Sequence, residues 1–211
     1  MPTRRNLHRA FPLVLLILAV VAASVLTLAT FQVRATSDEI ARALPGDALI
    51  PHALGAVNHA ITIHRPPREV WPWLAQMGSG RGGWYTYDFI DNRGYHSATQ
   101  VLPAFQDIHE GSIFPALPGA KDVFVVAAVE PKRSLVLAWR RPNGDYQTTW
   151  AFVLEESAPN VTRLIVRGRV AEGYNPYGLP QWMALLAARP AHFVMQRKQL
   201  VEIRKLVESH R

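Results

Sequence analysis

The chain has 211 residues, of which 49% are hydrophobic and 18% are charged, and it contains no cysteine. Its length fits one domain with an appendage, and the lack of cysteine excludes disulfides, thiolate zinc sites, iron–sulfur clusters and a cysteine nucleophile. The net charge of +7 belongs to the two ends, residues 1–10 and 189–211, and the rest of the chain sums to zero. A nucleic-acid-binding domain carries a basic stripe across its surface, so nucleic acid is not an expected partner.

No charged residue occurs from Phe11 to Phe31. About twenty helical residues rise about 30 Å, the thickness of a bilayer's hydrocarbon core, so residues 11–31 are predicted to form a transmembrane anchor. The basic residues 1–10 precede this run, and the positive-inside rule places them in the cytoplasm and the rest of the chain outside it. The alternatives are an exported protein, after cleavage of a signal sequence at 33–35, and a buried helix of a soluble core.

Residues 32–56 are predicted to link this anchor to a domain over 57–211. Proline and glycine interrupt every long periodic element of the linker, and only 36–44 has the length of two helical turns, with Ser37 or Asp38 as its N-cap.

The domain begins with a strand and a short helix and continues with a series of strands. The expected elements are a strand over 56–64, a helix over 68–77 with Pro72 near its first turn, a short helix near 99–105, strands over 112–115, 123–129, 134–140, 146–155 and 161–170, and a helix that starts afresh at Pro190. Residues 161–170 alternate between apolar side chains and arginines, which predicts an antiparallel strand with one face in water. The order of elements predicts an α+β domain whose curved antiparallel sheet packs on the long C-terminal helix.

Several segments resemble one known family. They are Ile61–Ile63, Pro66–Gly78, Arg81–Asp88, Leu102-Pro103 with Gly111, Trp150–Phe152, Thr162–Leu164 and His192–Met195. Together they are similar to the membrane-anchored bacterial branch of the START-like, or SRPBCC, superfamily, over about residues 57–207. The resemblance implies a helix-grip fold with an internal cavity for an apolar or amphipathic small molecule. Lipid carriers, hormone receptors and polyketide cyclases share this fold, so the resemblance implies no reaction and supplies no catalytic residue.

Aromatic side chains are the candidate ligand-binding residues, since such side chains line and grip apolar ligands. The candidates for the cavity lining are Trp84, Tyr85, Tyr87, Phe89, Trp139, Trp150, Phe152 and Phe193. The first four follow a glycine-rich turn and could equally fill the gap between the first helices and the sheet. Trp139 and Trp150 flank an Asn-Gly hairpin turn and could equally pack in the core.

Neither a metal, a cofactor nor a catalytic residue is predicted. The eight histidines form no ligand pair at metal-binding spacing, and the serines form no Gly-x-Ser-x-Gly elbow. Basic residues on the polar side of the C-terminal helix, Arg197, Lys198, Arg204 and Lys205, could touch anionic lipid headgroups or could simply be solvated.

The sequence therefore predicts a membrane-tethered protein that binds a hydrophobic small molecule or lipid, through no assigned chemistry. One alternative is a cyclase- or hydratase-like enzyme with an acid–base group in the pocket, and another is a protein-interaction module. The oligomeric state is not indicated.

Overall fold

The computed structural model describes residue 24 and residues 26–119, 123–141, 143–174 and 181–210. Most of the predicted anchor, including all of residues 11–23, therefore lies outside the described residues. Residues 26–32 are helical. Within the described part of the chain, no helix is both long and apolar enough to cross a bilayer.

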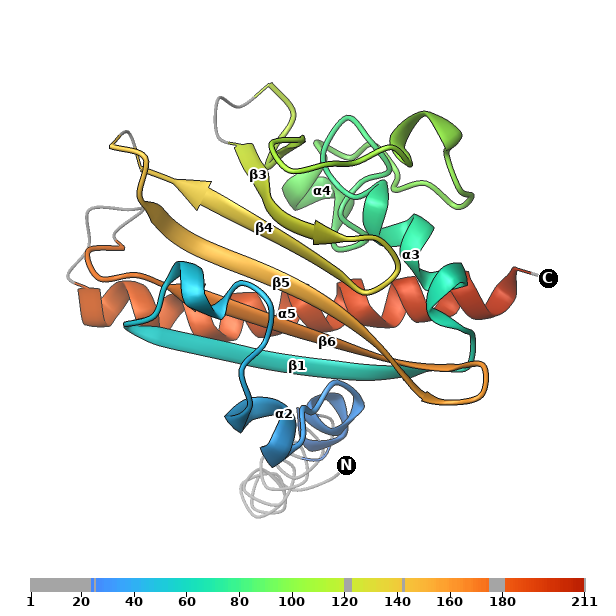
Figure 1. Cartoon of the computed structure of the whole chain (residues 1–211), viewed down its shortest axis with the longest axis horizontal. Helices are drawn as coiled ribbons and strands as arrows, with labels where there is room; N and C mark the ends of the chain where they lie inside the picture. The colour runs from blue at the N-terminus through green and yellow to red at the C-terminus, as the bar shows by residue number, and fades with distance from the viewer. Residues whose placement is uncertain (1–23, 25, 120–122, 142, 175–180, 211) are drawn as a thin grey trace, which may run out of the picture.

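Six strands form one antiparallel sheet in the order β1-β6-β5-β4-β3-β2. The strands are β1 (Gly55–Ile63), β2 (Ile113–Pro115), β3 (Val123–Glu130), β4 (Ser134–Arg140), β5 (Tyr146–Ala158) and β6 (Val161–Val170). The helices are α2 (Ser37–Ala41), α3 (Pro67–Ala75), α4 (Asp88–Asp91) and α5 (Gln181–Ser209), and 3-10 turns lie at Asp47–Leu49 and Pro103–Phe105. The curved sheet lies against α5, which runs along one of its faces (Figure 1). This is the predicted α+β helix-grip architecture.

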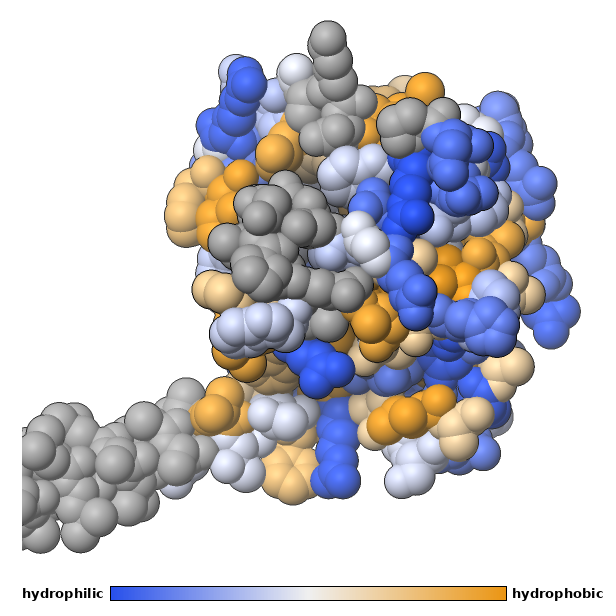
Figure 2. All heavy atoms as spheres, turned by 90° about the vertical axis from the view of Figure 1, so that its left-hand side faces the viewer, coloured by the Kyte–Doolittle hydropathy of each residue, from blue (hydrophilic) through white to orange (hydrophobic). Residues whose placement is uncertain are grey.

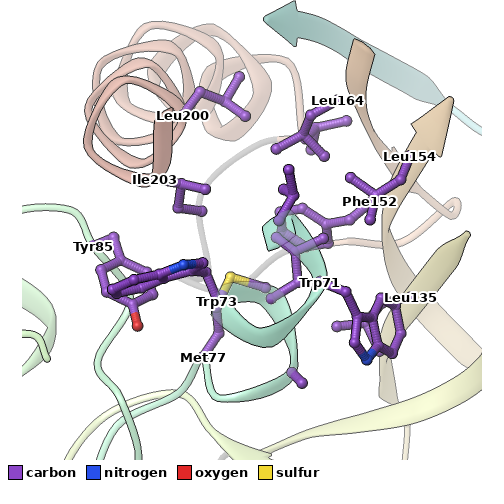
Figure 3. Packing of buried hydrophobic residues seen from close by; sticks show 14 of the residues in the cluster. Trp71, Trp73, Met77, Tyr85, Leu135, Phe152, Leu154, Leu164, Leu200 and Ile203 are labelled. Carbon is purple, nitrogen blue, oxygen red and sulfur yellow. The ribbon is translucent and has the colours of Figure 1, made fainter. Parts of the chain in front are cut away.

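The hydrophobic core fills the space between the sheet, α3 and the C-terminal half of α5 (Figure 3). Leu135 and Phe152 of the sheet meet Leu200 and Ile203 of α5 there, and all four are fully buried. Trp73 of α3 packs in the same cluster. The core fills the space between the sheet and the C-terminal half of α5. A pocket lies between the sheet and the N-terminal half of the helix.

The structure corrects three predicted helices. Helix α5 begins at Gln181 and continues through Pro190 instead of starting there. Only a 3-10 turn occupies the predicted helix near residues 99–105, and α4 was not predicted at all. Pro72 lies well inside α3, beyond its first turn. The errors at Pro190 and Pro72 share a cause, because tertiary contacts of a helix can outweigh the cost of an internal proline, about 3 kcal/mol.

The cap of α2 is a further correction, because Thr36 caps this helix instead of Ser37 or Asp38. The Thr36 hydroxyl accepts a hydrogen bond from the Glu39 backbone at 3.2 Å, and the Glu39 carboxylate accepts one from the Thr36 backbone at 2.7 Å. Threonine followed three residues later by glutamate is the capping-box pattern, so the signal was present in the sequence.

The arginine face of β6, predicted to be in water, is covered by the connector between the N-terminal helix and β1. Arg163 pairs with Glu39 at 2.7 Å. Arg167 is buried, pairs with Asp47 at 2.5 Å and donates to the backbone carbonyls of Glu39, Ile40 and Arg42. Arg169 donates to the carbonyl of Ile50. We call these three side chains the arginine clamp, and they attach residues 34–50 to the outer face of the sheet.

Candidate functional site

A pocket of about 340 Å³ lies between the N-terminal half of α5 and the sheet. The ends of β1, β4, β5 and β6 and the start of β3 contribute to its walls, together with the segment that contains Trp84. On the helix side, Ala188, His192 and Met195 face it, one helical turn apart or nearly so. The pocket is therefore the unfilled continuation of the hydrophobic core along the same helix.

Four aromatic rings form one wall of the pocket. Trp84 stacks on Trp150, with ring centroids 5.4 Å apart. Phe124 meets Trp84 edge-on at 5.7 Å, and Trp139 meets Phe124 at 6.4 Å. Such contacts between rings add to the stability that burial alone provides, so the wall is a preformed surface.

The glycine-rich turn before Trp84 sets the position of this ring. Gly78 and Gly83 exchange two backbone hydrogen bonds of 3.0 Å, which close the turn. Gly83 has a φ of +80°, and a Cβ atom there would lie 2.8 Å from the Cβ of Ser97. Only glycine satisfies both the left-handed backbone and this close approach. The turn leads directly into Trp84, whose indole N–H then donates to the Ala116 carbonyl at 3.0 Å.

Three of the eight candidate lining residues lie on the pocket: Trp84, Trp139 and Trp150. The other five lie outside its lining, contrary to expectation. Tyr85 is buried against Trp73, with its hydroxyl accepting from Gln76, and Phe152 is fully buried in the core.

The remaining three candidates also lie away from the lining. Phe193 packs partly buried against the core, whereas Tyr87 contacts Phe89, which is 75% exposed. Residues adjacent in an irregular segment point in different directions, and no periodic pattern in the sequence shows which ring faces inward.

A chain of hydrogen bonds that connects the aromatic wall to α5 was not predicted. The Trp150 indole N–H donates to Gln196 at 2.8 Å, the Gln196 amide donates to Gln199 at 2.7 Å, and Gln199 donates to the Trp84 carbonyl at 2.9 Å. Both glutamines are buried and line the pocket. Two glutamines at i and i+3 on the apolar side of a predicted helix were the available signal, because a buried amide needs partners.

His192 of α5 lines the pocket, and its ring contacts that of His59 on β1. The rings of His59 on β1 and His192 on α5 are stacked, with centroids 5.7 Å apart. Burial, followed by the neighbouring His59, lowers the pKa of His192 to about 4, and burial lowers the pKa of His59 as well. Both rings are therefore neutral near pH 7, and His192 presents a weakly polar rather than a charged surface to the pocket.

One carboxyl group, Asp91 of α4, lines the pocket. Its side chain accepts a hydrogen bond from the Thr86 hydroxyl, and its buried Oδ1 atom has no hydrogen-bond partner among the described residues. Burial is the main cause that raises the pKa of Asp91 above its usual value. Among the described residues, histidine, aspartate and glutamate side chains form no group of three that could hold a metal ion.

Comparison with known proteins shows similarity in structure only. Neither a family model nor a curated protein sequence matches the chain. Similar solved structures include a Polyketide_cyc-like protein from Corynebacterium glutamicum, with 15% identity over 75% of this chain and 94% of that one and a TM-score of 0.47. A protein from Mesorhizobium loti is 18% identical over 74% and 99%, with a TM-score of 0.46. An HSP90 activator from Plasmodium falciparum is 13% identical over 69% and 94%, with a TM-score of 0.45. At these values the similarities assign neither a family nor an activity.

Proposed function

We propose that this protein binds an apolar or amphipathic small molecule, such as a lipid, in the pocket between α5 and the sheet. The observation that carries the proposal is the aromatic-walled pocket of about 340 Å³, within the range of small-molecule sites. Two tryptophans of its wall are held by the glutamine chain on α5, so the surface that a ligand would contact is already ordered. A preformed apolar site binds without paying for its own ordering.

The second part of the proposal is that residues 11–31 tether the domain to a membrane, with the domain outside the cytoplasm. Signal cleavage at 33–35 is the rival, and the structure offers an argument against it. Val33 and Ala35 are buried, and the Val33 carbonyl accepts a hydrogen bond from Ala60 of β1 at 3.0 Å. Cleavage after Ala35 would remove two core residues and the hydrogen bond to β1 from the folded domain.

Binding is favoured over the two alternatives. A cyclase or hydratase needs an acid–base pair in the pocket. Among the described residues, the carboxyl group of Asp91 accepts its hydrogen bond from the Thr86 hydroxyl, and no hydrogen bond joins it to His192, the imidazole that lines the same pocket. An interaction module would be favoured by a collapsed, filled interior. The open pocket beside an ordered aromatic wall is what a carrier requires.

Filling the pocket tests the proposal. Ala188→Phe places a ring in the pocket, whereas Ala191→Phe adds the same volume at an exposed position on the same helix. We expect native mass spectrometry of the full chain, purified in mild detergent, to detect a copurified small molecule on the wild type and on Ala191→Phe. On Ala188→Phe this mass should be lost, because the ring occupies its space.

Thermal unfolding of both variants serves as the control, since each should retain a cooperative transition. A small molecule that still copurifies with Ala188→Phe would show that its binding site lies outside the pocket. A wild type without any bound molecule would favour the interaction module.

A further inference from the structure

The outer face of α5 presents an exposed apolar stripe. Trp182 is 67% exposed, Leu186 is 69% exposed and Val194 is 48% exposed. At about 100° per residue these three side chains fall within about a third of the helix circumference. Ala188 and His192, which face the pocket, point to the opposite side. Figure 2, which views the end of the domain where α5 begins, shows apolar atoms on that surface between hydrophilic ones. Apolar side chains that share one exposed face can mark an interaction surface.

The same face becomes basic toward the C-terminus of the helix. Arg197 lies about three turns beyond Leu186, in the same angular sector, and Arg204 follows two turns later. Lys198 and Lys205 flank them, and both contact the carboxylate of Glu202, at 2.8 Å and 3.7 Å. Two acidic groups on this half of the helix, Glu202 and Glu208, thus stand against four basic ones, so it carries net positive charge. An apolar segment followed by a basic one suits the interface of an anionic bilayer.

The helix of residues 26–32 ends beside this face. Arg197 donates a hydrogen bond to the Gln32 side chain at 2.5 Å. Leu28 and Phe31, in the turn before Gln32, are 68% and 61% exposed and belong to the end of the apolar run that starts at Phe11. A run of this length spans a bilayer, and it ends at the outer face of α5.

The arginine clamp holds this arrangement. Arg163 donates to the carbonyl of Arg34, two residues after Gln32, at 2.8 Å, and Arg167 attaches the following turns of the connector to β6. The domain is therefore not suspended from a loose linker. A tether that leaves the bilayer at Gln32 presents the outer face of α5 to that same bilayer.

We propose that the outer face of α5, from Trp182 to Lys205, rests on the membrane surface, with Trp182, Leu186 and Val194 in the interfacial layer and the basic residues on anionic headgroups. This inference rests on the proposed tether. It places the pocket one helix away from the lipid phase, because the inner side of the same helix forms the pocket wall. A second copy of the chain is the competing occupant of the stripe.

Site-directed spin labelling tests the docking, since the chain has no cysteine and a single introduced one labels a single site. Leu186→Cys places a nitroxide on the stripe. Ile113→Cys, at a 55% exposed apolar position on β2, labels the sheet edge opposite β1. In full-length protein in vesicles of phosphatidylcholine and phosphatidylglycerol, we expect several-fold fewer collisions with a water-soluble nickel complex, and several-fold more with oxygen, at position 186 than at 113. Trp182→Cys provides a second position on the stripe.

Three results would overturn the docking. If the protein stays with the vesicles but both positions show water-like collision frequencies, the tether is supported and the contact of α5 with the membrane surface is excluded. Spin–spin broadening at position 186 that disappears on dilution with unlabelled chain would assign the stripe to a second copy. A full chain that washes off the vesicles would remove the tether as well. Pocket binding is judged separately, by native mass spectrometry.

Discussion

Trp150 shows how one residue serves both the core and the pocket. Its ring lies 4.9 Å from that of Phe152, a fully buried core residue, and 5.4 Å from that of Trp84 on the pocket wall. Its indole N–H donates to Gln196. The sequence left open whether Trp150 packs in the core or lines the cavity. In the structure the same ring does both, because it contacts Phe152 in the core and lines the pocket beside Trp84.

His192 makes the stability of the domain depend on pH. Its pKa is about 4 in the folded protein and about 6.5 in the unfolded chain, so the unfolded state binds more protons between these values. We expect the free energy of unfolding to fall as the pH drops from about 6.5 to about 4, with a contribution from His192 of about 3 kcal/mol. His59 adds to the loss in the same direction. Urea unfolding in mild detergent across this range measures the slope.

The variant His192→Asn has no imidazole at this position. Its free energy of unfolding should therefore fall less steeply between pH of about 6.5 and about 4 than that of the wild type. His52→Asn is the matched control, because His52 is exposed. An unchanged slope in His192→Asn would show that other groups cause the acid sensitivity.

At the scale of elements, β6 contributes side chains to both faces of the sheet. Its apolar side chains enter the core, while Arg167 on the other face makes hydrogen bonds to the connector and to Asn58 of β1. Removing one partner of a buried ion pair leaves the other charge uncompensated. The strand therefore couples the connector to the stability of the whole sheet.

We expect Arg167→Ala to lower the free energy of unfolding by about 3 to 5 kcal/mol. Arg140→Ala is the control, since Arg140 is exposed and bonds only the exposed Tyr146 hydroxyl among the described residues; it should change stability by less than about 0.5 kcal/mol. Equal, small effects in chemical unfolding would mean that the connector is not held by the clamp. Limited proteolysis of residues 34–50 in Arg167→Ala gives an independent readout, because a detached connector is cleaved sooner.

The elements themselves were largely predictable. The strand over 134–140, predicted to follow the turn at 131–133, and the strand over 161–170 have the predicted bounds. The second follows from alternation with period two, which is a local property of the sequence. The short α4 and the continuation of α5 through Pro190 were not predictable, because contacts with distant residues outweigh local propensity there. The burial of the arginine face on β6 was likewise hidden, because arginine in a strand ordinarily indicates solvent.

At the scale of the whole molecule, the N-terminal helix, the clamp and the pocket form one arrangement. The connector leaves the N-terminal helix, is fixed to β6 by the clamp and continues into β1. The ends of β1 and β6 in turn help to line the pocket. The proposed tether and the proposed ligand site thus depend on the same two strands.

The mass of the mature protein tests the tether. We expect intact mass spectrometry of the membrane fraction to find residues 1–35 retained, since Val33 and Ala35 are buried parts of the folded domain. A chain that starts at Thr36 would show that a signal sequence is removed, and the domain would then be exported without an anchor.

The sequence by itself determined the class of the domain, the long C-terminal helix, the sheet and the apolar N-terminal run, because each follows from the composition or periodicity of one continuous segment. Only the tertiary structure decided which aromatic rings border the pocket, how two glutamines bridge Trp84 and Trp150, and why the β6 arginines are covered. These features join residues more than forty positions apart, such as Trp150 with Gln196 and Arg167 with Asp47. No local pattern encodes such pairs, since they arise when the sheet closes on α5 and the connector folds back over it.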